Sequence, residues 1–181
     1  VKTLPLTLGP DGVARPEAVS VDRPTDEICV TDARQSVFHL LTASGVPTFR
    51  TSHLAGLSHP GDGAVDAQGR IVFLDSAPGG GRTIGRLNAF GEPEPYSAES
   101  PGPDWRPAHL IITRDGGYVT ADAVTGVLAR HDPVSGKLIW QHRYAGEDGA
   151  EVNLGRPAEA PDGRLYVPGA GRRRGRRGAR R

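Results

Sequence analysis

The sequence predicts an all-β fold built from repeated four-stranded units, and three observations predict it. The chain of 181 residues contains 25 Gly and 16 Pro but only 6% aromatic residues and no Met. Gly and Pro at this level, spread along the chain, indicate many tight turns between short strands. Helical periodicity is sustained nowhere over about 11 residues. The third observation is an internal repeat.

The repeat is seen when the segments that begin at four prolines are aligned. These prolines are residues 16, 60, 107 and 157, which lie 44, 47 and 50 residues apart. In the first three units an apolar run and a turn lead to a second β-rich run that ends in Asp, at residues 28–32, 71–75 and 118–122. A fixed period of about 40 to 50 residues is typical of propellers and solenoids.

Each of these units continues with a third and a fourth β-rich run. The third runs are residues 36–42, 83–90 and 126–132, and the fourth runs are 47–52, 93–98 and 137–144. Four short strands joined by hairpin turns make one β-propeller blade. We therefore expect an incomplete propeller ring over residues 1–168, with blades at about 15–52, 59–98 and 106–144 and a partial blade at 156–168. Residues 1–14 are expected to supply a linker and the outer strand of a preceding blade, and residues 169–181 an irregular, disordered tail.

The repeated pattern Pro-x-x-apolar-x-apolar-Asp, a turn, then apolar-x-Val-x-Asp resembles the NHL repeat. The resemblance covers residues 15–167 and implies a propeller of the kind that usually has six blades. Such propellers serve as binding platforms, scaffolds, lyases and lactonases, so the resemblance predicts the fold better than the activity.

The residue before each repeat proline is basic, and the four are Arg15, His59, Arg106 and Arg156. In a propeller these positions lie where the outer strand of one blade leads into the inner strand of the next, at one end of the central channel. Four basic side chains there predict a binding site for a carboxylate or phosphate group, with Trp105 beside it. The simpler interpretation is that they are solvated loop residues.

Two residues after the second, third and fourth repeat prolines the chain carries Asp62, His109 and Glu159. Carboxylates and imidazole are common ligands of divalent cations, so these residues are candidate metal ligands. The simpler interpretation is a polar channel lining around water. The zinc-dependent amidating lyases of similar fold place a His directly after the repeat proline, whereas this sequence has Glu17, Gly61, Ala108 and Ala158 there.

These residues leave two functions open. The preferred one is a non-catalytic binding module that takes a small anionic ligand or a protein segment at the channel face, with no cofactor. The alternative is a metal-dependent lyase or lactonase-type hydrolase, streptogramin-lyase-like or gluconolactonase-like, in which Asp62, His109 and Glu159 would hold the metal.

The C-terminal tail carries seven of the 22 Lys and Arg residues, so the rest of the chain is acidic, with 21 Asp and Glu. The tail is compatible with an RNA-binding arm, a disordered solubilising terminus or a shifted reading frame. Binding to nucleic acid is expected only through this tail, and only if it is genuine.

No segment reaches the roughly 18 consecutive apolar residues of a membrane helix, so we expect a soluble chain. The sequence shows no leader segment and assigns no compartment, and an extracytoplasmic location stays open. The single cysteine, Cys29, is expected to be a buried small apolar residue.

Overall fold

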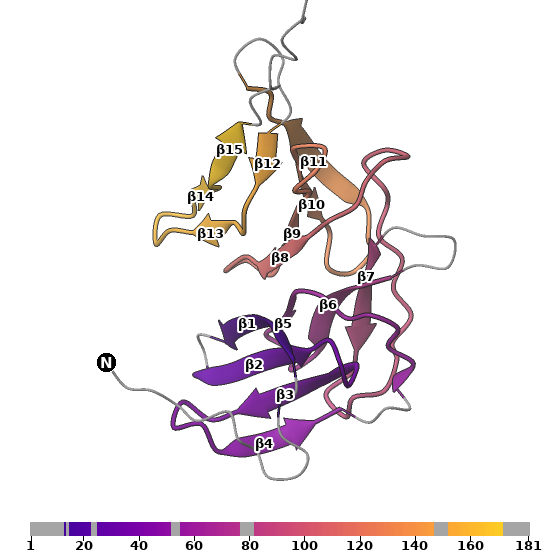
Figure 1. Cartoon of the computed structure of the whole chain (residues 1–181), viewed down its shortest axis with the longest axis vertical. Coiled ribbons are helices and arrows are strands. Elements are labelled where there is room, and N and C mark those ends of the chain that lie inside the picture. Colours follow the sequence, from indigo (N-terminus) through magenta and orange to yellow (C-terminus); the bar gives the residue numbers. More distant parts are fainter. Residues whose placement is uncertain are drawn as a thin grey trace, which may run out of the picture.

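The computed structural model describes residues 13, 15–22, 25–51, 55–76, 82–146 and 152–171. This described part forms fifteen β-strands and no α-helix, which confirms the all-β prediction (Figure 1). Accordingly, it includes no helix that is long and apolar enough to cross a membrane. The single cysteine, Cys29, is buried as expected.

The first and third units are four-stranded antiparallel sheets whose strands lie in chain order. The first sheet consists of β1 (Pro16–Asp22), β2 (Glu27–Asp32), β3 (Val37–Leu41) and β4 (Pro47–Arg50). The third sheet consists of β8 (His109–Ile112), β9 (Tyr118–Ala121), β10 (Val127–His131) and β11 (Leu138–Arg143). Both have the strand order of a propeller blade.

The second unit has three strands in place of the expected four. They are β5 (Gly63–Val65), β6 (Ile71–Ser76) and β7 (Arg82–Leu87). The fourth strand expected at residues 93–98 is reduced to one bridge between Leu87 and Pro93. Prolines 93 and 95 have no N–H group to donate to the ladder, which is the physical reason for the loss.

The fourth unit is made of two short antiparallel pairs. They are β12 (Val152–Leu154) with β15 (Gly169–Gly171), and β13 (Ala158–Glu159) with β14 (Leu165–Tyr166). The expectation that the tail is irregular from residue 169 was therefore wrong, because residues 169–171 pair with β12. Residues 172–181, and the outer strand expected within residues 1–14, lie outside the described residues apart from Val13.

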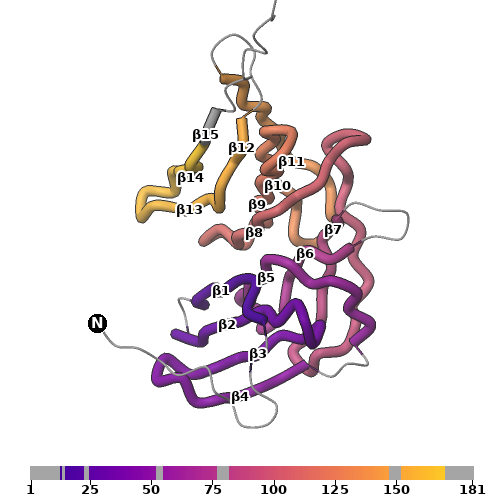
Figure 2. Tube along the Cα trace, viewed as in Figure 1, coloured from indigo at the N-terminus to yellow at the C-terminus, as the bar shows by residue number. Residues whose placement is uncertain are grey.

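Apolar layers between neighbouring units hold the units together, since alternate side chains of a strand point to opposite faces of its sheet. In β6, Ile71 and Phe73 pack with residues of the first unit, whereas Val72 and Leu74 pack with Leu110 and Tyr118 of the third. A third layer joins the third unit to Leu154 of the fourth. The result is an open arc of blades (Figures 1 and 2). Apolar side chains stay exposed in the first and last units, at Val19 (56%), Val21 (57%) and Tyr166 (59%).

A carboxylate at the end of the second strand of each of the first three units accepts backbone N–H groups. Asp122, which is fully buried, accepts hydrogen bonds from the backbone N–H groups of Arg106 (2.7 Å), Val124 (2.8 Å) and Thr125 (2.9 Å). Asp32, which is also fully buried, accepts those of Arg15, Arg34 and Gln35 in the same pattern. Asp75, which is half-buried, accepts those of Ser58, His59 and Ser76. We call Asp32, Asp75 and Asp122 the clamp aspartates.

Replacing a clamp aspartate should destabilise the fold strongly. In Asp122→Ala three backbone N–H groups lose their acceptor, so we expect the free energy of unfolding to fall by about 3 kcal/mol. Urea unfolding, monitored by circular dichroism, measures this free energy. The control is Asp162→Ala, in an exposed turn, where we expect a change within about 0.5 kcal/mol. Equal losses in the two variants would contradict the role given to Asp122.

Candidate functional site

Three of the four predicted basic residues occupy equivalent places on successive units. The backbone N–H groups of Arg15, His59 and Arg106 are among those held by the clamp aspartates. Each residue therefore lies beside the end of the second strand of its unit, at the same end of the blades. Their side chains are exposed.

The fourth basic residue, Arg156, reaches inward and contacts each of the other three units. Its Nη1 donates to the carbonyl of Val19 in the first unit (2.5 Å) and its Nη2 donates to the carbonyl of Leu110 in the third (3.4 Å). Its Nη2 also forms an ion pair with Asp62 Oδ1 of the second unit at 3.2 Å. One guanidinium thus connects the first three units with the fourth.

Asp62 is the buried acid of this group, with 4% of its surface exposed. Its Oδ2 accepts the Leu110 N–H at 3.0 Å. Its Oδ1 has the ion-pair contact to Arg156 but no partner in hydrogen-bond geometry among the described residues. Burial raises the pKa of Asp62, and the Arg156 charge and the Leu110 N–H oppose that rise.

His109 lies next to Asp62, with Nδ1 3.9 Å from Asp62 Oδ2. Burial lowers the pKa of His109; the Asp62 charge opposes this, and the guanidinium groups of Arg156 and Arg82 add to it. These effects together favour the neutral imidazole. We call Asp62, His109 and Arg156 the channel cluster.

The three predicted metal ligands do not gather at one point. Glu159 instead accepts the backbone N–H of Arg114 at 2.7 Å. In the part of the chain that the structure describes, no three His, Cys, Asp or Glu side chains form a group able to hold a metal ion. Of the predicted set, only Asp62 and His109 are neighbours, and a divalent metal stays a prediction.

Trp105, the remaining predicted site residue, packs outside the channel cluster. It lies against the apolar layer between the second and third units, and its ring centroid is 5.3 Å from that of His131. Its Nε1 is buried without a hydrogen-bond partner in the described residues. Its neighbour Arg106 therefore faces solvent while Trp105 faces the protein.

Sequence reasoning missed Arg82, at the start of β7. Its guanidinium lies so close to Gly61 that a β-carbon there would be 2.7 Å from Arg82 Nη1, and its charge acts on His109. The signal available for Arg82 was a charged residue at the first position of a strand. Such residues are common in any sequence, so this signal does not single out Arg82.

Comparison with family models and with curated proteins found no match. Solved structures do match. Virginiamycin B lyase from Staphylococcus aureus is similar at 15% identity and a TM-score of 0.63, over 91% of this chain and 51% of that chain. A catalytically inactive form of that lyase with quinupristin gives 14% identity and a TM-score of 0.63, over 88% and 50%. A streptogramin B lyase gives 19% and 0.60, over 88% and 49%.

These matches show that the chain has a β-propeller fold of the kind found in those lyases. The identities are low, so the similarity is one of fold. The chain spans about half the length of the structures it matches. The NHL type of repeat and a total of six blades stay predictions.

The lowered pKa of His109 predicts a pH dependence of stability. Because its pKa in the folded state lies below the ordinary histidine value of 6.5, the unfolded chain binds more protons between these two pKa values. The free energy of unfolding should therefore fall as the pH is lowered from 7.5 through about 6.5 and down to the folded pKa. Burial lowers the pKa of His39 and His131 too, with the same sign.

We expect His109→Gln to lose less stability than the parent protein between pH 7.5 and 5, because one of the three imidazoles with a lowered pKa is gone. Urea midpoints at each pH measure it. Comparing the variant with the parent at the same pH removes most of the contributions of other groups, Asp62 included. His142→Gln, at an exposed position of β11, is the control. Parallel curves for His109→Gln and the parent would rule out the effect.

Proposed function

We propose that this chain is a ligand-binding β-propeller module that takes an anionic group of a small molecule or protein segment at one end of its channel. The observation that carries the proposal is the placing of Arg15, His59 and Arg106 by the clamp aspartates. Three basic side chains are held at equivalent positions of successive units, so they are presented at one end of the arc.

The electrostatics at this end support the proposal. The clamp aspartates at this end of the blades each accept backbone N–H groups. Within the described residues, Arg15, His59 and Arg106 form no ion pair. Two guanidinium groups without a protein counter-ion favour a carboxylate or phosphate, which they bind by charge-assisted hydrogen bonds.

Removing two of the basic side chains should abolish binding of an anion. With citrate and inorganic phosphate as probes, we expect Arg15→Ala/Arg106→Ala to bind at least about tenfold more weakly than the parent, since a hydrogen bond to a charged group contributes about 1.5–3 kcal/mol. Isothermal titration calorimetry at constant ionic strength measures the affinity.

The matched control is Lys137→Ala/Arg164→Ala, which removes the same charge from turns at the opposite strand ends. We expect this variant to bind both probes as the parent does. Equal weakening in the two double variants would show non-specific attraction, and no binding by the parent would overturn the proposal for these anions.

A second candidate function is a lyase of the streptogramin B kind, which the His109–Asp62 pair favours. A neutral imidazole beside a buried carboxylate is able to accept a proton in a reaction. The solved structures with a similar fold include such lyases, one of them with quinupristin.

If this second function holds, incubating the protein with quinupristin should convert quinupristin into an opened product, which mass spectrometry detects. We expect conversion to require His109, and therefore to be lost in His109→Gln and kept in His142→Gln. Reactions with and without added Mg²⁺ test the predicted divalent metal. Intact quinupristin in both reactions would reject the lyase function.

A further inference from the structure

The first unit presents an apolar sheet face at one end of the arc (Figure 1). In β2, Cys29 packs against the second unit. Its neighbours Ile28 and Val30 point to the opposite face, because side chains alternate along a strand, and they pair there with Val21 and Val19. Val19 and Val21 are 56% and 57% exposed. Neither belongs to an apolar layer between the described units, so this face is free to bind a partner.

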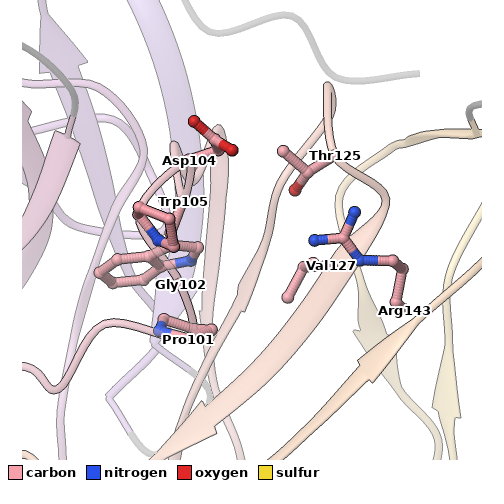
Figure 3. Close-up of a pocket in the computed structure, with 8 residues that line it drawn as sticks. Pro101, Gly102, Asp104, Trp105, Thr125, Val127 and Arg143 are labelled. Atoms are coloured by element: carbon pink, nitrogen blue, oxygen red, sulfur yellow. The ribbon is translucent and has the colours of Figure 1, made fainter.

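A hollow of about 440 Å³ lies on this free face of the first unit. Its apolar lining includes Pro16, Val19, Ile28, Val30 and Leu41, and Glu17 is the one charged residue among its described lining. The pocket beside Trp105, between the loop of residues 101–105 and the third unit, is much smaller, at about 40 Å³ (Figure 3). That space suits a few waters. Of the two, the hollow on the first unit is the one that can receive a large side chain.

The last unit presents a complementary face at the other end of the arc. Leu165 and Val167 pack towards the third unit, so Tyr166, which lies between them, points away from it. Tyr166 is 59% exposed. Arg164, two residues earlier, exposes 77% of its side chain, and its ion pair with Asp162 is on the surface. The first face thus offers a hollow and a carboxylate, and the last face offers an aromatic ring and a guanidinium.

The inner units of the arc show how two such faces pack together. Wherever two units are neighbours along the chain, apolar side chains of their facing sheets form a layer between them. Between the first and last units the arc stays open (Figures 1 and 2). The chain has about half the length of the propeller structures that it matches. Two copies therefore supply about as many residues as one propeller of that kind.

We propose that the free face of the first unit binds the free face of the last unit of a second copy of this chain, and that two copies close one ring. Tyr166 of one copy enters the hollow of the other, and Arg164 pairs with Glu17. A contact between two different faces closes into a ring when its rotation returns to the start, and here the rotation is half a turn. Each pair of copies has two identical contacts. The proposal does not depend on the anion site or on the channel cluster.

The mass of the full chain in solution tests the pairing. In size-exclusion chromatography with light scattering we expect the parent to have the mass of two chains. We expect Val19→Asp to have the mass of one chain, because it puts a carboxylate into the apolar contact. The control is Val134→Asp, at a valine of the third unit that is 82% exposed, with the mass of two chains. A parent with the mass of one chain at every concentration overturns the proposal, and assemblies longer than two chains overturn the closed ring.

Two charge reversals identify the faces, and they serve also if circular dichroism shows that Val19→Asp is unfolded. In Glu17→Arg and in Arg164→Glu, each taken alone, like charges meet in both contacts, so we expect pairing at least about tenfold weaker than in the parent. When the two variants are mixed in equal amounts we expect the mass of two chains again. The introduced arginine then meets the introduced glutamate in one contact, and the other contact has its original residues. Unchanged pairing of Arg164→Glu alone, or no recovery in the mixture, overturns the proposal.

Discussion

The carboxylate at the end of the second strand in the first three units is the interaction on which the rest of the structure depends. In Asp122 one carboxylate holds the segment that enters the blade and the turn that leaves its second strand. A buried charge is stable only when hydrogen bonds or a partner compensate it, and here backbone N–H groups do so. The clamp therefore fixes how one blade follows another, and it also fixes where the residue before the repeat proline lies.

The sequence predicted the units well, because the proline and aspartate that define them are also the residues that the fold needs at fixed places. It predicted the strand edges less well. Pro93 and Pro95 were placed in a fourth strand on apolar pattern alone, although a proline cannot donate to a ladder. The strand at residues 169–171 was missed because glycine and alanine carry no β pattern, and its pairing with β12 depends on a partner about 17 residues earlier.

The candidate site was also predicted only in part from the sequence. Spacing from the repeat proline predicted equivalent positions for Arg15, His59 and Arg106, and the N–H group of each is bound by a clamp aspartate. It did not foresee that Arg156 turns inward, because a side chain's direction depends on which charges surround it. Asp62 is a buried carboxylate, and the Arg156 guanidinium forms an ion pair with it at 3.2 Å. Glu159 does not lie with the other predicted metal ligands, because its carboxylate accepts a hydrogen bond from the N–H of Arg114.

The fourth unit lacks the clamp. In the repeat, Gly169 occupies the position that Asp122 has in the third unit. There the Gly155 N–H donates a backbone hydrogen bond to the Pro168 carbonyl (2.7 Å), which joins the segment that enters the unit to the segment that follows its second strand. In a stacked array, stability is approximately a sum of unit and interface contributions, so the least tied unit opens at the lowest free energy. Arg156 begins this unit and would leave the channel with it. Local unfolding of this unit would therefore also take the Arg156 guanidinium away from the Asp62 carboxylate and expose that carboxylate to water.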